Sequence, residues 1–173
     1  MPIVPIEIKG KLKTPQIDPS CWISESAWIV GDVKLGPENV VYQGAIIRGD
    51  FAPITIGAKN VFQDGCIINT AEGFKTVIGD NNLIGFSAIV HGATVKNNSV
   101  VGIQSVLMIG VVVEDDAMVG ATSFVAMNTK VPQGQKWIGR ELKGENTQGK
   151  MWEMGRQSWR KMGIEMKTQK QKP

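Results

Sequence analysis

The sequence predicts an all-β solenoid, a left-handed parallel β-helix, followed by a C-terminal α-helix. Three observations support this prediction. Val and Ile together number 37 against 5 Leu, an aliphatic side chain recurs every six residues, and residues 140–173 are rich in Met, Trp and basic side chains. Because β-branched residues favour extended strands and Leu favours helix, the composition argues against an all-helical bundle.

The six-residue repeat is longest between residues 77 and 131, where ten aliphatic side chains follow one another at this interval. Shorter runs in the same spacing cover residues 23–47 and the pair Val61 and Ile67. Such a period is typical of a hexapeptide-repeat β-helix, in which each hexad supplies a strand and a turn. We expect three hexads to close one coil, residues 18 apart to stack, and the repeated aliphatic residues to form interior columns. A β-sandwich is the alternative, but sandwich strands do not hold a strict period of six.

Two breaks in the repeat, at residues 49–53 and 70–75, predict loops that project from the coil. The composition changes near residue 140, because residues 140–173 hold nine Lys or Arg against four acidic residues. We therefore divide the chain into a β-helix domain, residues 1–139, and a helical tail, residues 140–173.

The tail carries Met151, Trp159, Met162 and Met166 at spacings that approximate one helical face. We expect this face to pack along the β-helix of the same chain or of a neighbouring subunit. A basic helix can also bind a membrane surface or nucleic acid, but acidic residues interrupt this one, so neither partner is predicted.

Composition limits the remaining possibilities. The chain has no run of about 18 apolar residues and no signal-peptide pattern at its start, so we expect no membrane span and a cytoplasmic location. Cys21 and Cys66 are isolated and are predicted to be small buried apolar residues without a disulfide. His91 is the single histidine, so one chain cannot build a site of several histidines.

Five short motifs follow one another in the predicted β-helix. They are Gly31-Asp32-Val33, Arg48-Gly49-Asp50, Gln63-Asp64-Gly65, Ile84-Gly85-Phe86 and Val90-His91-Gly92. In order and spacing, residues 24–139 resemble the γ-class carbonic anhydrase family, whereas the tail does not closely resemble the C-terminal helix of that family. The resemblance implies a left-handed β-helix homotrimer that binds a divalent metal between subunits.

The same resemblance assigns roles to four of these residues. Arg48 and Asp50 match residues that pair across the trimer interface and order the site. Gln63 and Asp64 match residues that hold a metal-bound water and support the interface. An ion pair is the stronger interpretation of Arg48 and Asp50, whereas Gln63 and Asp64 are either inherited scaffold or part of a substrate site.

The three metal-binding histidines of the family fall at Asn69, Phe86 and His91, of which positions 69 and 91 belong to one subunit and position 86 to its neighbour. Asn69 offers a weak amide oxygen and Phe86 offers no lone pair, while a catalytic zinc site supplies three protein ligands. Without the metal, water keeps a high pKa and the nucleophile for CO2 hydration is missing. We therefore predict no bound zinc and no ordinary carbonic anhydrase activity.

His91 has two interpretations. It either has a structural role, bound to Asn69 or to a backbone carbonyl, or it is a general acid or base beside Gln63 and Asp64. Asn69, Phe86 and Gln104 are candidate substrate-binding residues, and Gln104 stands where the family usually has glycine.

Several functions remain open at this stage. The leading hypothesis is a homotrimer whose intersubunit pocket binds or acts on a small acid or a CoA ester, with CoA as part of the substrate. An acyltransferase of the same repeat class, a non-catalytic scaffold subunit that docks through its tail, and residual carbonic anhydrase activity are the alternatives.

Overall fold

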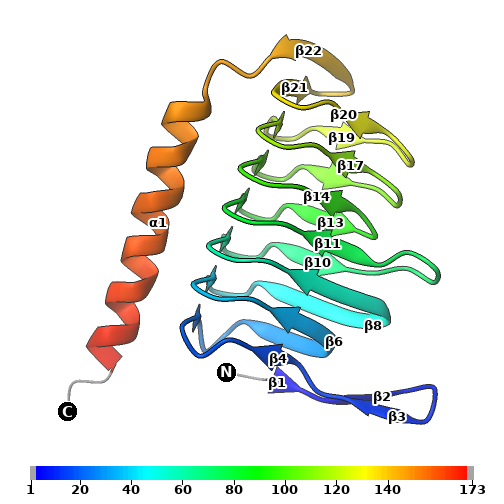
Figure 1. The fold of residues 1–173 in the computed structure, drawn as a ribbon, viewed down its shortest axis with the longest axis vertical. Helices are drawn as coiled ribbons and strands as arrows, with labels where there is room; N and C mark the ends of the chain where they lie inside the picture. Colours follow the sequence, from blue (N-terminus) through cyan, green and yellow to red (C-terminus); the bar gives the residue numbers. More distant parts are fainter. Residues whose placement is uncertain (1–2, 171–173) are drawn as a thin grey trace.

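Short parallel strands stack on one another to form a left-handed β-solenoid, with one helix lying along its side (Figure 1). The structure is a computed structural model that describes residues 3–170. The predicted fold class is confirmed, because successive coils pair in parallel through most of the chain.

Three sheets account for the strands within residues 3–170. The 12-stranded sheet contains β1 (Ile3–Val4), β4 (Gln16–Ile17), β6 (Trp28–Leu35), β8 (Ile46–Ile56), β10 (Ile67–Asn69), β11 (Thr76–Ile78), β13 (Ile89–His91), β14 (Thr94–Val95), β16 (Val106–Leu107), β17 (Val112–Val113), β19 (Phe124–Val125) and β20 (Lys130–Val131). The 8-stranded sheet contains β5 (Trp22–Ile23), β7 (Val40–Val41), β9 (Val61–Phe62), β12 (Leu83–Ile84), β15 (Val100–Val101), β18 (Met118–Val119), β21 (Gln135–Ile138) and β22 (Glu141–Glu145). Strands β2 (Ile6–Ile8) and β3 (Lys11–Lys13) form an antiparallel hairpin.

The long strands β6 and β8 cover two faces of the coil, because each pairs with strands on both faces. The prediction of a loop at residues 49–53 is therefore wrong, since these residues lie inside β8. Residues 70–75 do form a loop between β10 and β11, closed by a bridge between Ala71 and Phe74.

The interior columns agree with the predicted repeat only in part. Val101 pairs with Val119 at the expected spacing of 18, whereas Ile84 pairs with Val101 at a spacing of 17. The interior residues before the shift are Ile78, Ile84 and Val90, and the predicted Val77, Leu83 and Ile89 lie outside the main core. Phe62 and Ile68 likewise replace Val61 and Ile67.

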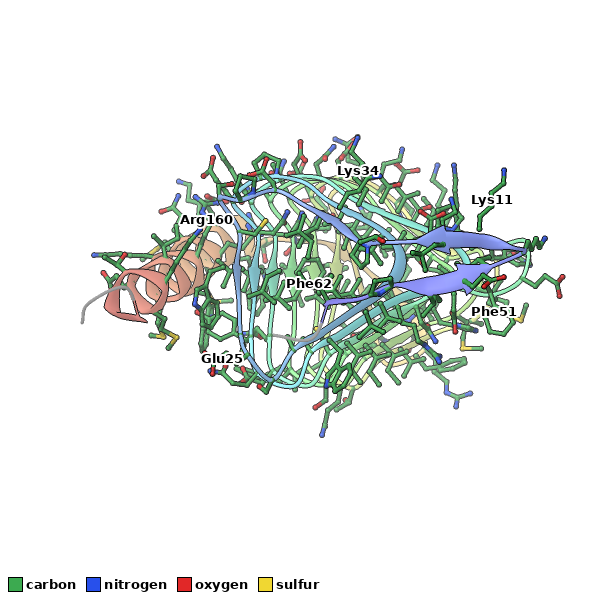
Figure 2. All side chains as sticks on the ribbon, turned by 90° about the horizontal axis from the view of Figure 1, so that it is seen from below. Lys11, Glu25, Lys34, Phe51, Phe62 and Arg160 are labelled. Carbon is green, nitrogen blue, oxygen red and sulfur yellow. The ribbon has the colours of Figure 1, made fainter. Side chains whose placement is uncertain are left out.

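This error has a simple cause. Two adjacent apolar residues occur in each of these hexads, so both registers look apolar in the sequence. The hexad that ends at Val95 is one residue short, because interior side chains stand at Val90 and Val95. A shift of one residue turns a strand's side chains to its opposite face. Figure 2 shows Phe62 within the coil and Lys34 pointing away from it.

Helix α1 (Gly149–Lys170) runs antiparallel to the direction in which the coils stack (Figure 1). It begins after the predicted start of the tail, because residues 141–145 form β22 and pair with β21. Trp152, Trp159 and Met166 pack on the outer side of the 8-stranded sheet. The predicted helical face was wrong in part, since Met151 is 50% exposed and Met162 is 45% exposed.

Both cysteines are free and buried, as predicted. Burial raises the pKa of the Cys66 thiol far above its usual value, because the thiolate would be desolvated. A ladder of buried amides supports one corner of the coil: the Oδ1 atom of Asn39 accepts hydrogen bonds from Asn60, and the Oδ1 atom of Asn60 accepts them from Asn82.

Candidate functional site

One face of the solenoid presents a continuous column of partly exposed apolar side chains, and within residues 3–170 only Arg140, which lies over the Phe124 ring, is recorded in contact with its outer side. The column arises because paired strands in register place equivalent side chains above one another. It consists of Trp28, Ile46, Ile67, Ile89, Val106 and Phe124, and we name it the apolar stripe. Trp28 is 48% exposed and Phe124 is 36% exposed, so the stripe is open to solvent in a single chain.

A polar column lies beside the apolar stripe, two residues further along each strand. It contains Arg48, Asn69 and His91, which strand register places side by side. The Nδ1 atom of His91 lies 2.8 Å from the Oδ1 atom of Asn69. Because an amide oxygen only accepts hydrogen bonds, this contact places the proton of a neutral imidazole on Nδ1 and leaves the lone pair on Nε2.

Arg48 and Asp50 form an ion pair within the chain, with 3.3 Å between Nη1 and Oδ2. Nearly half of the Arg48 side chain is exposed, so solvent screens this pair and it contributes less than about 1 kcal/mol to stability. The Asp50 carboxylate also accepts a hydrogen bond from the backbone N–H of Phe51. The ion-pair interpretation agrees with this geometry, and pairing across a subunit interface stays a prediction.

The other predicted site residues lie at the opposite end of this face, at the corner next to α1. Asp64, Phe86 and Ile103 stack there, because the backbone N–H of Ser87 donates to Asp64 and that of Gln104 donates to Phe86. The backbone of Gln104 has a φ of 55°, a left-handed conformation that favours glycine. This conformation explains why the family resembled by this sequence usually has glycine at the position. Its side chain is exposed.

Aromatic contacts tie this corner to α1. The ring of Phe86 meets Trp159 edge to face, with 5.6 Å between centroids. Tyr42 contacts the same tryptophan at 5.4 Å and donates a hydrogen bond from its hydroxyl to the Trp159 carbonyl. Burial, aided by the negative charge of Asp64, raises the pKa of Tyr42 to about 12, so this hydroxyl stays protonated at neutral pH.

An ion pair within α1 is hydrogen-bonded to the coils through Asn81 and the Asn98 carbonyl. Arg156 is 4% exposed and binds the Glu153 carboxylate, with 2.7 Å between Nη2 and Oε2. Hydrogen bonds from Arg156 first, and then from Asn81, lower the pKa of Glu153 to about 2. The helix is therefore anchored in one register on the coils.

A cavity of about 450 Å³ lies between α1 and the coils. We name it the helix groove, and its walls are almost entirely apolar. Gln63 and Phe86 line its lower part, and Met151 and Trp152 line it near the start of the helix. Sequence reasoning missed this cavity, although the glycines at positions 85, 102 and 120 were a usable signal, because they leave one column of the coil without side chains.

The single chain therefore divides the predicted site residues into two groups. Arg48, Asn69 and His91 share one edge of the open face, and Gln63, Asp64, Phe86 and Gln104 occupy the corner at the other edge. Within the described residues, no hydrogen bond or ring contact joins the two groups.

Residues 3–170 contain neither a cluster of metal-ligating side chains nor a membrane-spanning helix. Nowhere in this range do three or more His, Cys, Asp or Glu side chains gather as a metal site requires. None of the helices in the same range has the length and apolar character needed to cross a membrane.

Known proteins show where this architecture recurs. The chain is 37% identical over 137 residues to mitochondrial γ-carbonic anhydrase 2 of Arabidopsis thaliana, covering 76% of this chain and 49% of that protein. It is 33% identical over 125 residues to the carnitine operon protein CaiE of Escherichia coli K12, covering 72% of this chain and 64% of CaiE. The chain is a γ-carbonic anhydrase-like hexapeptide-repeat protein. It spans about half the length of the plant relative.

Solved structures support the assignment of this γ-carbonic anhydrase-like chain to the left-handed β-helix fold. A hexapeptide transferase family protein from Anaplasma phagocytophilum superposes with a TM-score of 0.84 at 29% identity, covering 94% of this chain and 96% of that one. The N-acyltransferase AntD from Bacillus cereus, solved with dTDP and 3-hydroxybutyryl-CoA, superposes with a TM-score of 0.68 at 16% identity, covering 85% and 90%. At 16% identity, the similarity to AntD shows only that the two proteins share a fold. No protein-family model matches the chain.

Proposed function

We propose that this γ-carbonic anhydrase-like chain forms a homotrimer whose intersubunit pocket binds and hydrolyses a CoA ester of a small acid, without zinc-dependent CO2 hydration. The observation that carries the proposal is the His91–Asn69 pair, which leaves Nε2 of a neutral imidazole as a free base on an uncovered face. Imidazole accepts and releases protons near neutral pH, as a general base requires.

The apolar stripe supports association of identical chains. Six coils contribute to it, it is partly solvent-exposed in one chain, and continuous exposed apolar surfaces of this kind mark association sites. In a cyclic homotrimer, each interface joins two different edges of the subunit, so the polar column of one subunit lies against the corner next to α1 of its neighbour. The proposed site thus joins Arg48, Asn69 and His91 of one subunit with the corner residues Gln63, Asp64 and Phe86 of the next.

The donor set does not fit a three-histidine zinc site. The His91 Nδ1 atom is engaged by Asn69, and Phe86 directs its ring onto Trp159. Position 86 therefore supplies an apolar wall where a metal site needs a lone pair. Metal analysis of the purified protein together with a CO2 hydration assay tests this part, and stoichiometric zinc would refute it.

The proposed reaction needs only water as a second substrate. His91 Nε2 takes a proton from water while the water oxygen bonds to the thioester carbonyl carbon, forming a tetrahedral oxyanion. Collapse of this species re-forms the carbonyl, breaks the carbon–sulfur bond, and passes the proton to the departing CoA thiolate. The amide of Gln63 and the guanidinium of Arg48 are the groups we assign to binding the carbonyl and the acid. A CoA ester is compatible with this architecture, since AntD binds one.

A screen of CoA esters with the wild-type protein and His91→Ala tests the proposal. We expect kcat to fall about 100-fold or more in the variant, as for loss of a general base. Thr94→Ala, on the neighbouring face, is the matched control and should retain activity. Turnover that is unchanged in His91→Ala would remove His91 from this role, and absence of turnover with every ester would refute hydrolysis.

A scaffold function is the second candidate, because α1 exposes apolar side chains on its outer side. Met154 is 70% exposed and Ile164 is 42% exposed. Such residues are suited to docking another protein. The scaffold hypothesis predicts a complex that survives His91→Ala and is lost when both outer residues are changed to Asp. A cytoplasmic location stays a prediction.

A further inference from the structure

The helix groove has the shape of a narrow channel that follows the axis of the solenoid. Gln63, Gly85, Gly102 and Gly120 occupy equivalent positions on four successive coils, since each donates its backbone N–H to the coil that follows. The three spacings between these four coils, each about 4.8 Å, give the channel a length of about 14 Å. A cavity of about 450 Å³ with this length suits a linear ligand better than a ring-shaped one.

Gln63 is the polar exception in this apolar lining. Its side chain is 4% exposed, and none of the hydrogen bonds within residues 3–170 involves its amide. Neither amide atom is sealed from solvent, and Gln63 is one of the residues that line the groove. The amide can therefore exchange its hydrogen bonds with water for one to a ligand carbonyl without breaking a contact inside the protein.

Gly155 provides an independent indication of a ligand. It lies in the interior of α1, where glycine costs about 1 kcal/mol relative to alanine. At Gly163 packing requires glycine, because an added Cβ would meet Val40. At Gly155 an added Cβ would meet no atom within 4 Å. Packing therefore does not account for this glycine, and its position on the groove wall keeps the channel open.

The chemistry of the walls narrows the class of ligand. Phe86, Trp159 and Met118 offer apolar contacts to a hydrocarbon chain. Asp64 follows Gln63 in the chain, and together with burial its negative charge raises the pKa of Tyr42. A ligand with a negative charge at the Gln63 end of the groove would be repelled by this carboxylate. A neutral carbonyl is the group that the Gln63 amide binds without this repulsion.

We propose that the helix groove binds the acyl chain of a neutral ester, thioester or amide. The carbonyl of the ligand lies at Gln63, and its hydrocarbon tail lies along Gly85, Gly102 and Gly120 of the coils and Gly155 of the helix. This inference deepens the proposed function and rests on it for the contact between the carbonyl and a neighbouring subunit's catalytic base. The groove itself lies within one chain, so binding can be measured separately from catalysis.

Titration calorimetry with octanamide tests the proposal. We expect the wild-type protein to bind, and Gly155→Leu, which fills the channel, to weaken binding at least tenfold while its Tm stays equal or rises, because leucine favours helix. Ser158→Leu adds the same side chain at an exposed position of α1 and should bind like wild type. Gln63→Leu should remove the preference for octanamide over octanoate.

Three outcomes separate this inference from the proposed function. Absence of octanamide binding by the wild-type protein, or equal affinity in Gly155→Leu, overturns the groove proposal. Octanamide binding by both wild type and His91→Ala supports the groove, whatever the activity. Octanamide binding without hydrolysis of any CoA ester refutes the proposed function and leaves the acyl groove supported.

Discussion

Replacement of Asn60 by alanine tests how the coils are held in register. The Asn60 side chain accepts hydrogen bonds from both the backbone N–H and the Nδ2 of Asn82, at 2.9 and 3.0 Å, and donates to the Gly79 carbonyl. Asn60 and Asn82 are both fully buried. Asn60→Ala therefore leaves two donors of Asn82 without an acceptor in the interior.

Each unsatisfied buried donor costs about 1–3 kcal/mol, so the free energy of unfolding should fall by about 2–6 kcal/mol. Equilibrium urea unfolding, followed by circular dichroism at fixed protein concentration, measures this change. With a slope of about 2–3 kcal/mol per molar urea, the midpoint should fall by about 0.7–3 M. Gln43→Ala, at an exposed corner, is the control and should change the free energy by less than about 0.5 kcal/mol. An equally small effect of Asn60→Ala would refute the reasoning about the buried amide ladder.

Two further predictions concern the interface and the helix. Ile67→Asp, in the middle of the apolar stripe, should convert the trimer to monomers in light-scattering measurements at micromolar concentration, because it places a charge in the proposed interface. Val77→Asp, equally outward on the neighbouring face, should leave the trimer intact; dissociation by both variants, or by neither, contradicts the assignment of the interface. Glu153→Gln should lower stability at neutral pH by about 1–2 kcal/mol, a value reduced by solvent screening because the carboxylate is 38% exposed. The lowered pKa means that this difference is complete above about pH 4.5 and disappears as the pH falls toward about 2, which thermal unfolding across that range measures; a difference that grows on acidification would contradict it.

Part of the candidate site was accessible from sequence, because the resemblance to the γ-carbonic anhydrases places positions 69 and 91 in one subunit. Asn69 and His91 pair as neighbours. They are 22 residues apart, four more than the predicted coil of 18, because the loop at 70–75 lies between them, so counting by 18 alone does not find the pair. The Arg48–Asp50 ion pair is also local, because its members are two residues apart on one strand. Roles for these residues in catalysis or at an interface remain predictions, since a single chain leaves the two edges of the site apart.

The six-residue period and the excess of Val and Ile by themselves determined that the chain forms a solenoid, because the period repeats once per strand whatever the tertiary details. They did not determine which member of each aliphatic pair points inward. Leu83 and Ile84 are equally apolar, and only the docking of α1 on the 8-stranded sheet gives Leu83 a buried environment outside the coil. The helix groove was likewise a result of tertiary structure, since its walls come from glycines of three coils and from a helix that reaches them only after folding back along the solenoid.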